Sequence, residues 1–230
     1  MSNNMDLGYE MFCYQCEQTA GGKGCTKQGV CGKTAEVANL QDLLLYQLKG
    51  IGAYAKMLMD AGQTVEKKVV RFVENCLFTT LTNVNFDADV HVALLKQSQK
   101  IKEKLRAQVR KERLPEPKAV QAAFNLPETK AEMLRVAEVA GIMYEQDLDP
   151  DIRSLRMTIL YGLKGISAYG HQARELGFFS EQGDAFYLEA LAELTNDELG
   201  AEELIRLTMR TGETALDVMK TLDEANTKVY

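Results

Sequence analysis

The sequence predicts an all-α protein in which two tandem three-helix bundles follow a cysteine-rich loop. Two observations favour this class: long stretches rich in Ala, Leu, Glu, Lys and Met place apolar residues at helical spacing, and signals for β-strands are scarce. The chain has 230 residues, of which 46% are hydrophobic, and this is enough apolar surface to bury a core. We therefore expect a fold that needs no disulfide bonds.

Four segments are expected along the chain. The stretch Leu114-Pro115-Glu116-Pro117 interrupts the helical pattern, because each proline lacks a backbone donor and restricts the residue before it. We place the boundary between the two helical units there. The expected segments are an N-terminal tail and cysteine loop at 1–34, a first three-helix unit at 35–113, a linker at 114–127 and a second helical unit at 128–230.

Capping and turn residues set the expected helix limits. Gly62 can adopt the left-handed conformation that ends a first helix, and Thr64 can cap the second. The turn-forming sequence NVNFD precedes the third helix. Asp149 is the expected cap of a later helix, with Pro150 in its first turn. The expected helices cover residues 34–60, 65–82, 87–111, 128–144, a stretch beginning at 150, 181–194 and 197–225.

The two helical units share an internal repeat. Residues 40–56, LQDLLLYQLKGIGAYAK, align without gaps to residues 155–171, LRMTILYGLKGISAYGH, and nine of the seventeen positions are identical. An internal duplication is the simplest explanation.

Two glycines and six polar side chains of the repeat are candidates for special roles. Gly50 and Gly165 fall in mid-helix, where glycine costs about 1 kcal/mol relative to alanine. A tight helix crossing would explain both, and the alternative is a backbone that lines a path to a cofactor. The tyrosines and lysines occur in both copies, which favours a shared packing role; they are Tyr46, Lys49 and Tyr54, and Tyr161, Lys164 and Tyr169.

Charge and hydropathy exclude several classes of protein. The net charge is -6 and no long run of Lys or Arg occurs, so no nucleic-acid partner is expected. No apolar stretch reaches the roughly 18 to 20 residues of a membrane span, and the opening MSNNMDLGYE is polar and acidic, unlike a signal sequence. We expect a cytoplasmic protein. In that reducing compartment, clustered cysteines favour metal binding or redox chemistry over disulfides.

The main candidate site is a run of four cysteines. The sequence FCYQCEQTAGGKGCTKQGVCG has the spacing C-x2-C-x8-C-x5-C, which places Cys13, Cys16, Cys25 and Cys31 within nineteen residues. A 4Fe-4S cluster needs four thiolate ligands, and a short loop can supply them if its backbone turns sharply. The loop glycines permit such turns; they are Gly21, Gly22, Gly24, Gly29 and Gly32.

Zinc is the main alternative for this loop, since four-cysteine zinc sites also use C-x2-C. Zinc ribbons usually contain two close cysteine pairs, whereas Cys25 and Cys31 are five residues apart and no second C-x2-C follows. The spacing therefore favours iron-sulfur, and leaves zinc, disulfides and free thiols open. It also differs from the common ferredoxin patterns.

Other residues carry weaker signals. The basic and aromatic neighbours of the cysteines could offset the cluster's negative charge or exclude water; they are Lys23, Lys27, Lys33, Phe12 and Tyr14. Cys76 lies in the helical pattern VENCLF and is expected to be a small buried apolar residue. His91 and His171 are not in a ligand-like pair and are expected to be structural or surface residues.

The run MFCYQCEQTAGGKGCTKQGVCGKTAEVANLQDLLLYQLKGI closely resembles the N-terminus of hybrid-cluster proteins, also called hydroxylamine reductases. Three later stretches resemble successive parts of the first domain of that family: RSLRMTILYGLKGISAYGHQARELGF, FYLEALAELTND and VMKTLDEANT. The likeness covers residues 11–227. It favours iron-sulfur over zinc more strongly than the spacing does.

The resemblance implies a helical domain of two three-helix units whose N-terminal cysteines bind a 4Fe-4S cluster that relays electrons. It assigns ligation to Cys13, Cys16, Cys25 and Cys31. Members of that family are more than twice as long, and the hybrid iron-sulfur-oxygen cluster that performs the reduction is bound by later α/β domains. We therefore expect this chain to lack the hybrid cluster and not to be a complete catalyst. Its expected partners are those C-terminal domains and a redox donor protein or reductase.

Two functions remain to be distinguished. The first is a 4Fe-4S electron-transfer domain of a hydroxylamine-reductase-like oxidoreductase. The alternative is a helical interaction module in which zinc or a cluster is a structural staple without a redox role. Catalysis by this chain alone would require an open metal position, and the sequence offers no second set of soft ligands for one.

Overall fold

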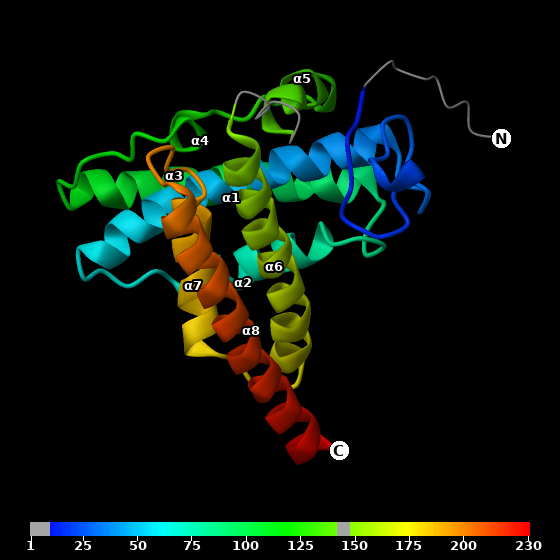
Figure 1. Ribbon diagram of the computed structural model, residues 1–230. Helices are drawn as coiled ribbons and strands as arrows, with labels where there is room; N and C mark the ends of the chain where they lie inside the picture. Colours follow the sequence, from blue (N-terminus) through cyan, green and yellow to red (C-terminus); the bar gives the residue numbers. More distant parts are fainter. Residues whose placement is uncertain (1–9, 142–147) are drawn as a thin grey trace.

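The computed structural model describes residues 10–141 and 148–230, and its regular elements there are helices (Figure 1). This confirms the predicted all-α class with a cysteine-rich loop at its start. The helices are α1 (Ala35–Asp60), α2 (Lys67–Thr79), α3 (Ala88–Lys111), α4 (Val120–Ala123), α5 (Lys130–Val136), α6 (Pro150–Glu175), α7 (Glu181–Glu193) and α8 (Ala201–Val229). Two 3-10 turns, η1 (Ala20–Gly22) and η2 (Ala137–Ala140), complete the list. No helix in the described ranges is long and apolar enough to cross a membrane.

Three helices begin within one residue of their expected starts, each after a capping side chain. The hydroxyl of Thr34 accepts a hydrogen bond from the N–H of Val37 at the start of α1. Asp87 and Asp149 cap α3 and α6 in the same way, each accepting from two backbone N–H groups. Each side chain satisfies donors that have no partner inside the helix, which fixes the first turn.

Two helices begin later than predicted. The start of α2 follows Glu66 rather than the expected cap Thr64, because the chain stays extended while the side chain of Val65 packs into the core. The start of α8 follows Gly200 rather than residue 197, because the Asn196 side chain accepts from the N–H of Glu198 and holds a local turn there.

The region predicted as one helix over residues 128–144 is broken. Thr129 and Glu132 form a capping box that starts α5, but the helix continues only as the turn η2. Gly141 is extended (ψ 159°), which ends that turn. The rest of the expected helix, 142–147, lies outside the described residues. The expected linker, 114–127, contains the short helix α4.

The helix α1 is the centre of the molecule. It packs between α3 and α7, while α6 pairs with α8 and crosses α2 (Figure 1). One continuous hydrophobic cluster includes buried residues from both expected units. The two expected units, 35–113 and 128–230, therefore share one core. The division of the chain between them stays a prediction.

The two central glycines of the repeat have different surroundings. A Cβ on Gly50 would lie 2.3 Å from the carbonyl oxygen of Gln121 in α4, so the expected close approach is confirmed there. A Cβ on Gly165 would meet nothing within 4 Å. The tight crossing predicted at Gly165 is wrong, because no segment of the described chain covers that face of α6 at this point.

A buried ion network joins α2, α6 and α7. Arg174 donates through Nε and Nη2 to the carboxylate of Glu74, which is 0% exposed, and it also pairs with Asp184. Burial raises the pKa of Glu74, and the guanidinium of Arg174 opposes that change. The network is satisfied only while all three helices are packed together.

Candidate functional site

The cysteine loop is closed by its own main chain. Cys13 and Cys25 form an isolated antiparallel bridge, in which the N–H of Cys13 donates to the carbonyl of Cys25 (3.0 Å) and the N–H of Cys25 donates back (2.8 Å). The N–H of Thr19 donates to the carbonyl of Cys16 (3.1 Å), and this hydrogen bond forms a turn in the segment between Cys13 and Cys25. The first and third cysteines of the motif are thereby held side by side.

Glycines let the loop fold closely around its cysteines. Four of them have positive φ, as the sequence predicts, and these are Gly21, Gly22, Gly24 and Gly32. Gly24 also passes under an aromatic ring, since a Cβ there would lie 2.5 Å from the ring of Phe12. At Gly29, which has no positive φ, a Cβ would lie 3.0 Å from Sγ of Cys31. A larger residue at Gly29 would therefore crowd that thiol.

The surroundings of the Cys25 thiol favour its thiolate form. It is buried, and its sulfur accepts from the N–H of Ala20 (3.4 Å) and lies 3.7 Å from the hydroxyl of Thr19. Backbone hydrogen bonds from Ala20 and Val30 lower the pKa of Cys25 below its usual value, against the opposing effect of burial. Hydrogen bonds to cysteine sulfur also tune the potential of iron-sulfur clusters.

All five cysteines are free thiols in this structure, so no disulfide joins the four cysteines of the loop. Within residues 10–141 and 148–230, no group of three His, Cys, Asp or Glu side chains is placed to hold a single metal ion. Cys76 is completely buried in α2, and burial raises the pKa of its thiol far above the usual value. The prediction that Cys76 is a small core residue is confirmed.

Of the three lysines near the motif, only Lys33 is buried. Its Nζ donates to Oε1 of Gln41 (2.6 Å), and Nε2 of Gln41 lies 3.2 Å from Nε2 of His91. His91 is 0% exposed, and burial lowers the pKa of its ring, which keeps the ring neutral. Lys23 and Lys27 are exposed. His91 therefore has a structural role, holding Gln41 under Lys33.

The second histidine is also structural. Nδ1 of His171 lies 3.0 Å from Oδ1 of Asn75, and its ring stacks on Phe78 with centroids 4.8 Å apart. Both contacts are to α2, so His171 joins α6 to α2 in agreement with the sequence-based expectation.

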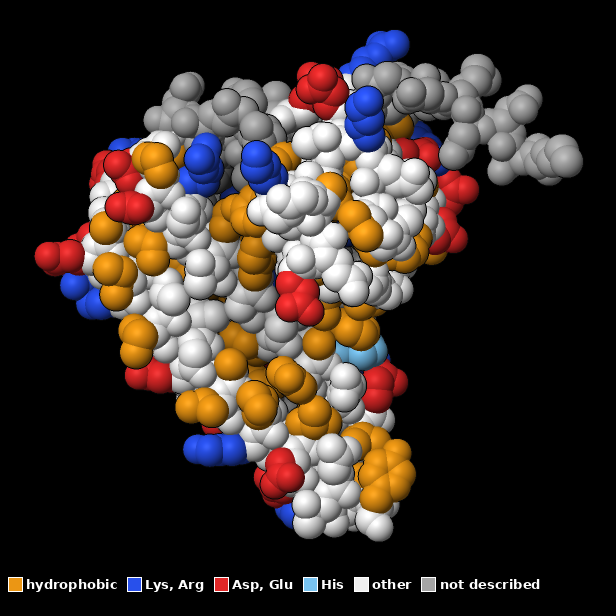
Figure 2. Space-filling view, turned by 45° about the vertical axis from the view of Figure 1, so that its right-hand side comes forward, with side chains coloured by type: hydrophobic (Ala, Val, Ile, Leu, Met, Phe, Trp, Pro, Cys, Tyr) orange, Lys and Arg blue, Asp and Glu red, His pale blue; other side chains and the backbone are white. Residues whose placement is uncertain are grey.

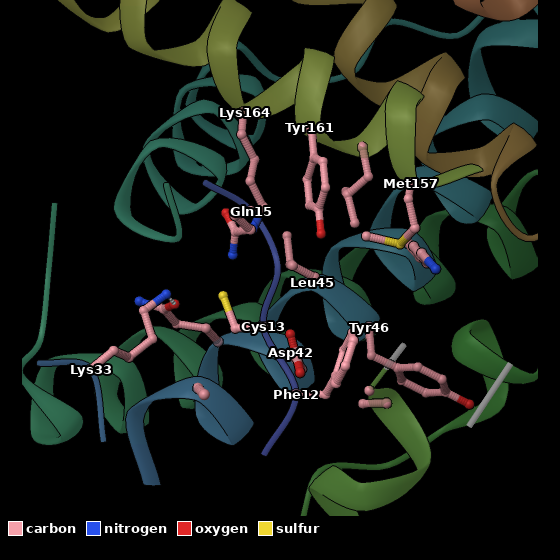
Figure 3. A pocket seen from close by; sticks show the side chains of 16 residues that line it. Phe12, Cys13, Gln15, Lys33, Asp42, Leu45, Tyr46, Met157, Tyr161 and Lys164 are labelled. Atoms are coloured by element: carbon pink, nitrogen blue, oxygen red, sulfur yellow. Dashed lines mark hydrogen bonds between the residues drawn. The ribbon is translucent and has the colours of Figure 1, made fainter. Parts of the chain in front are cut away.

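A pocket lined by both charged and apolar side chains lies directly beside Cys13, between α1 and α6 (Figure 3). Lys164 and Tyr161 extend from α6 toward the loop segment that carries Cys13, and Asp42 and Tyr46 face them from α1. The aromatic rings continue into the loop, since Tyr14 contacts Tyr161 edge-on with centroids 5.8 Å apart. The pocket is therefore a continuation of the cysteine site.

The repeated tyrosines and lysines meet at this pocket. Tyr46 and Lys49 of the first repeat and Tyr161 and Lys164 of the second all line this one pocket. The sequence signal is the motif Y-x-x-K, which occurs in both copies and by itself favours a shared packing role. The third repeated tyrosine differs: Tyr54 is buried near Glu116, whereas Tyr169 is exposed.

Lys164 connects the two halves of the chain at this pocket. Its Nζ donates to Oε1 of Gln15 (3.1 Å), between the first two cysteines, and to the carbonyl of Thr80 (3.2 Å) at the C-terminal end of α2. The ammonium thus meets the negative end of a helix dipole.

Burial shifts the charge state of the pocket. It raises the pKa of Asp42 to about 6, although Lys164, Lys33 and Lys49 lower it. It also lowers the pKa of Lys164 to about 7, although the Asp42 carboxylate raises it. The polypeptide alone therefore holds these charges weakly, and a further negative charge nearby would favour a protonated Lys164.

The residues present fit a 4Fe-4S cluster in their chemistry. Four free thiols stand in one glycine-rich loop, a backbone N–H donates to the sulfur of Cys25, and buried ammonium groups lie beside the loop. These are the ligand type, the sulfur hydrogen bonding and the counter-charge that such a cluster requires.

Comparison with known proteins gives a consistent result. The model of the Prismane/CO dehydrogenase family matches residues 11–230. The chain is 41% identical to a hydroxylamine reductase of Bacteroides thetaiotaomicron over 220 residues, and 41% identical to one of Desulfitobacterium hafniense over 222 residues. Each match covers 96% of this chain but only 39% and 40% of the relative. The chain thus spans about two fifths of the length of these relatives, in their N-terminal part.

Proposed function

Because the chain belongs to the Prismane/CO dehydrogenase family, we propose that it is a 4Fe-4S electron-transfer domain of a hydroxylamine-reductase-like oxidoreductase. The observation that carries this proposal is the closed cysteine loop, in which Cys13 and Cys25 are bridged and the Cys25 sulfur accepts a backbone N–H. The proposed ligands are Cys13, Cys16, Cys25 and Cys31.

When bound, such a cluster accepts and donates one electron at a time. The chain's own residues have three tasks around it. The loop backbone holds Cys13 beside Cys25, the Ala20 N–H stabilises a thiolate at Cys25, and the rings of Phe12 and Tyr14 exclude water from one side. Each task stabilises a bound cluster without supplying a site for substrate.

The reduction of substrate belongs to the rest of the longer relatives in this proposal. Their names identify them as hydroxylamine reductases, and about three fifths of their length has no counterpart in this chain. We propose that the hybrid cluster is bound by that remaining part. Its proposed partners are this domain and a redox donor protein or reductase. A cytoplasmic location fits free thiols in a reducing compartment.

One surface bears on the alternative of an interaction module. The solvent side of α8 presents large apolar side chains at helical spacing, and Figure 2 shows apolar side chains gathered in the lower half of the molecule, where α6 and α8 lie. The large apolar side chains of this stripe are Ile205, Met209, Leu216 and Met219, and Val229 is exposed at the end of the helix. Such a stripe is typical of a contact surface. It is compatible with both functions, because an electron-transfer domain must also dock.

Anaerobic purification with metal and sulfide analysis tests the proposal. We expect a brown protein with about four irons and four sulfides per chain, the composition of one cubane, and an electron paramagnetic resonance signal after reduction. Cys25→Ser should lose most of the iron. Cys76→Ser is the matched control, because Cys76 is a buried core thiol of α2, and it should retain the iron. A colourless protein with one zinc per chain would establish the staple alternative instead.

A further inference from the structure

The pocket beside Cys13 contains more positive than negative charge. Among the described residues that line it, three lysines face a single carboxylate, Asp42. Lys33 and Lys164 are 2% and 1% exposed. Two ammonium groups are therefore buried where the described lining residues supply one carboxylate.

The hydrogen-bond partners of these two lysines are neutral. Lys33 donates to the amide oxygen of Gln41, and Lys164 donates to the amide oxygen of Gln15 and the carbonyl of Thr80. Burying an ammonium group is costly unless an opposite charge is close. The geometry places the Lys164 ammonium beside the cysteine loop, because its partner Gln15 lies between Cys13 and Cys16, and thiolates there would supply negative charge.

We propose that Lys164 and Asp42 set the reduction potential of the cluster held by the cysteine loop, with Lys164 raising the potential and Asp42 lowering it. This inference rests on the proposed function. A cubane with four thiolate ligands is anionic, and reduction adds one more negative charge. A nearby cation stabilises the reduced form and a nearby anion destabilises it, so the two residues act with opposite signs. Both are positioning residues, since they hold charge near the cluster without ligating it.

The proposal explains why a helix from the second half of the chain reaches the loop. Gln15 and Lys164 are 149 residues apart in sequence, and their contact places the α6 ammonium next to the segment between two ligands. Its repeat counterpart Lys49 lines the same pocket but is only partly buried, so its charge is screened more strongly by water.

Redox titration of the reconstituted 230-residue protein with dithionite tests the proposal, with the potential read from the paramagnetic signal of the reduced form. Lys164→Met is expected to lower the potential and Asp42→Asn to raise it. Lys102→Met is the matched control, since Lys102 is also 2% exposed but donates to carbonyls of Gln121 and Phe124, away from the loop. Its potential should equal that of the wild type.

The outcomes separate this inference from the function on which it rests. Wild-type protein without iron or sulfide would overturn both. Wild-type protein with a cluster, but with unchanged potentials or shifts of the same sign in the two pocket variants, would overturn the inference and leave the electron-transfer proposal standing. If Lys164→Met fails to take up a cluster, Asp42→Asn decides: a raised potential supports the proposal, and an unchanged or lowered one overturns it.

Discussion

The helices α1 and α6 have similar sequences and different surroundings. The shift of 115 residues that aligns 40–56 with 155–171 also places Ala35 on Pro150 and Asp60 on Glu175, so the two helices have corresponding limits. The following helices, α2 and α7, have 13 residues each. Yet α1 is enclosed by α3, α4, α5 and α7, whereas no described residue covers α6 at Gly165. The matching sequences give the two helices the same limits. The helices packed against them determine the surroundings of each residue.

The largest difference between the two helices is expected from a substitution at Arg174 in α6. Its counterpart in α1 under the same shift is the apolar Met59, so the charge is needed only in the second copy. Arg174→Met would leave the completely buried Glu74 unpaired, and we expect a loss of about 3–5 kcal/mol in the free energy of unfolding. Urea denaturation measures this loss.

An exposed pair provides the control for that loss. Arg71 and Glu175 also join α2 to α6, but both side chains are 58% exposed. Arg71→Met is expected to cost no more than about 1 kcal/mol. Equal losses in the Arg174 and Arg71 variants would mean that burial of the ion network does not determine its contribution.

The buried lysine of the first half gives a pH-dependent test. Burial lowers the pKa of Lys102 to about 8, against an ordinary value of 10.5. Between these values the unfolded chain holds a proton that the folded chain has lost, so stability should rise with pH through this window. The gain for this group approaches roughly 3 kcal/mol by pH 10.5. Denaturation curves of the wild type and Lys102→Met at pH 7 and pH 10 measure this gain. An equal change in the free energy of unfolding between the two pH values in both proteins would contradict the prediction.

The two repeat glycines should respond to alanine with opposite signs. Gly50→Ala forces a Cβ against the carbonyl of Gln121, and overpacking of this kind costs about 1–3 kcal/mol. Gly165→Ala meets open space and gains helix propensity, so a stabilisation of up to about 1 kcal/mol is expected. Thermal unfolding of both variants checks the signs. Destabilisation by Gly165→Ala would show that the face of α6 is covered in solution.

The smallest effect is expected on α8. Replacing Met209 and Leu216 by glutamate changes a solvent-facing stripe, so the free energy of unfolding should change by less than about 0.5 kcal/mol per site. If the stripe mediates contact between molecules, the same variant should sediment as a smaller species than the wild type at high concentration. Identical sedimentation, with the wild type monomeric, would limit the stripe to contacts with another partner.

Local signals in the sequence predicted the parts of the fold that depend on local interactions. The caps Thr34, Asp87 and Asp149 begin helices because a side chain three residues or fewer away satisfies the backbone. The start of α2 was missed because it depends on Val65 packing against distant helices. The open face at Gly165 was missed for the same reason, since a helical pattern does not state which neighbours are present.

The candidate site also has one part that the local sequence predicts and another that depends on distant segments. The cysteine spacing and the glycines with positive φ were readable from one short stretch, and the ligand assignment stays a prediction. The pocket was not readable, because it depends on α1, α6 and the loop meeting in space. Lys164 illustrates the limit: its sequence suggested packing, and only its contact with Gln15 reveals a position beside the cysteines.

That contact also has a consequence for biosynthesis. A ribosome adds about 5–20 residues per second, so Lys164 emerges about 7–30 seconds after Gln15. During this interval the bridge between Cys13 and Cys25 can already form, while the wall supplied by α6 does not yet exist. The loop can therefore close around its thiols before α6 is present to form the second wall of the pocket.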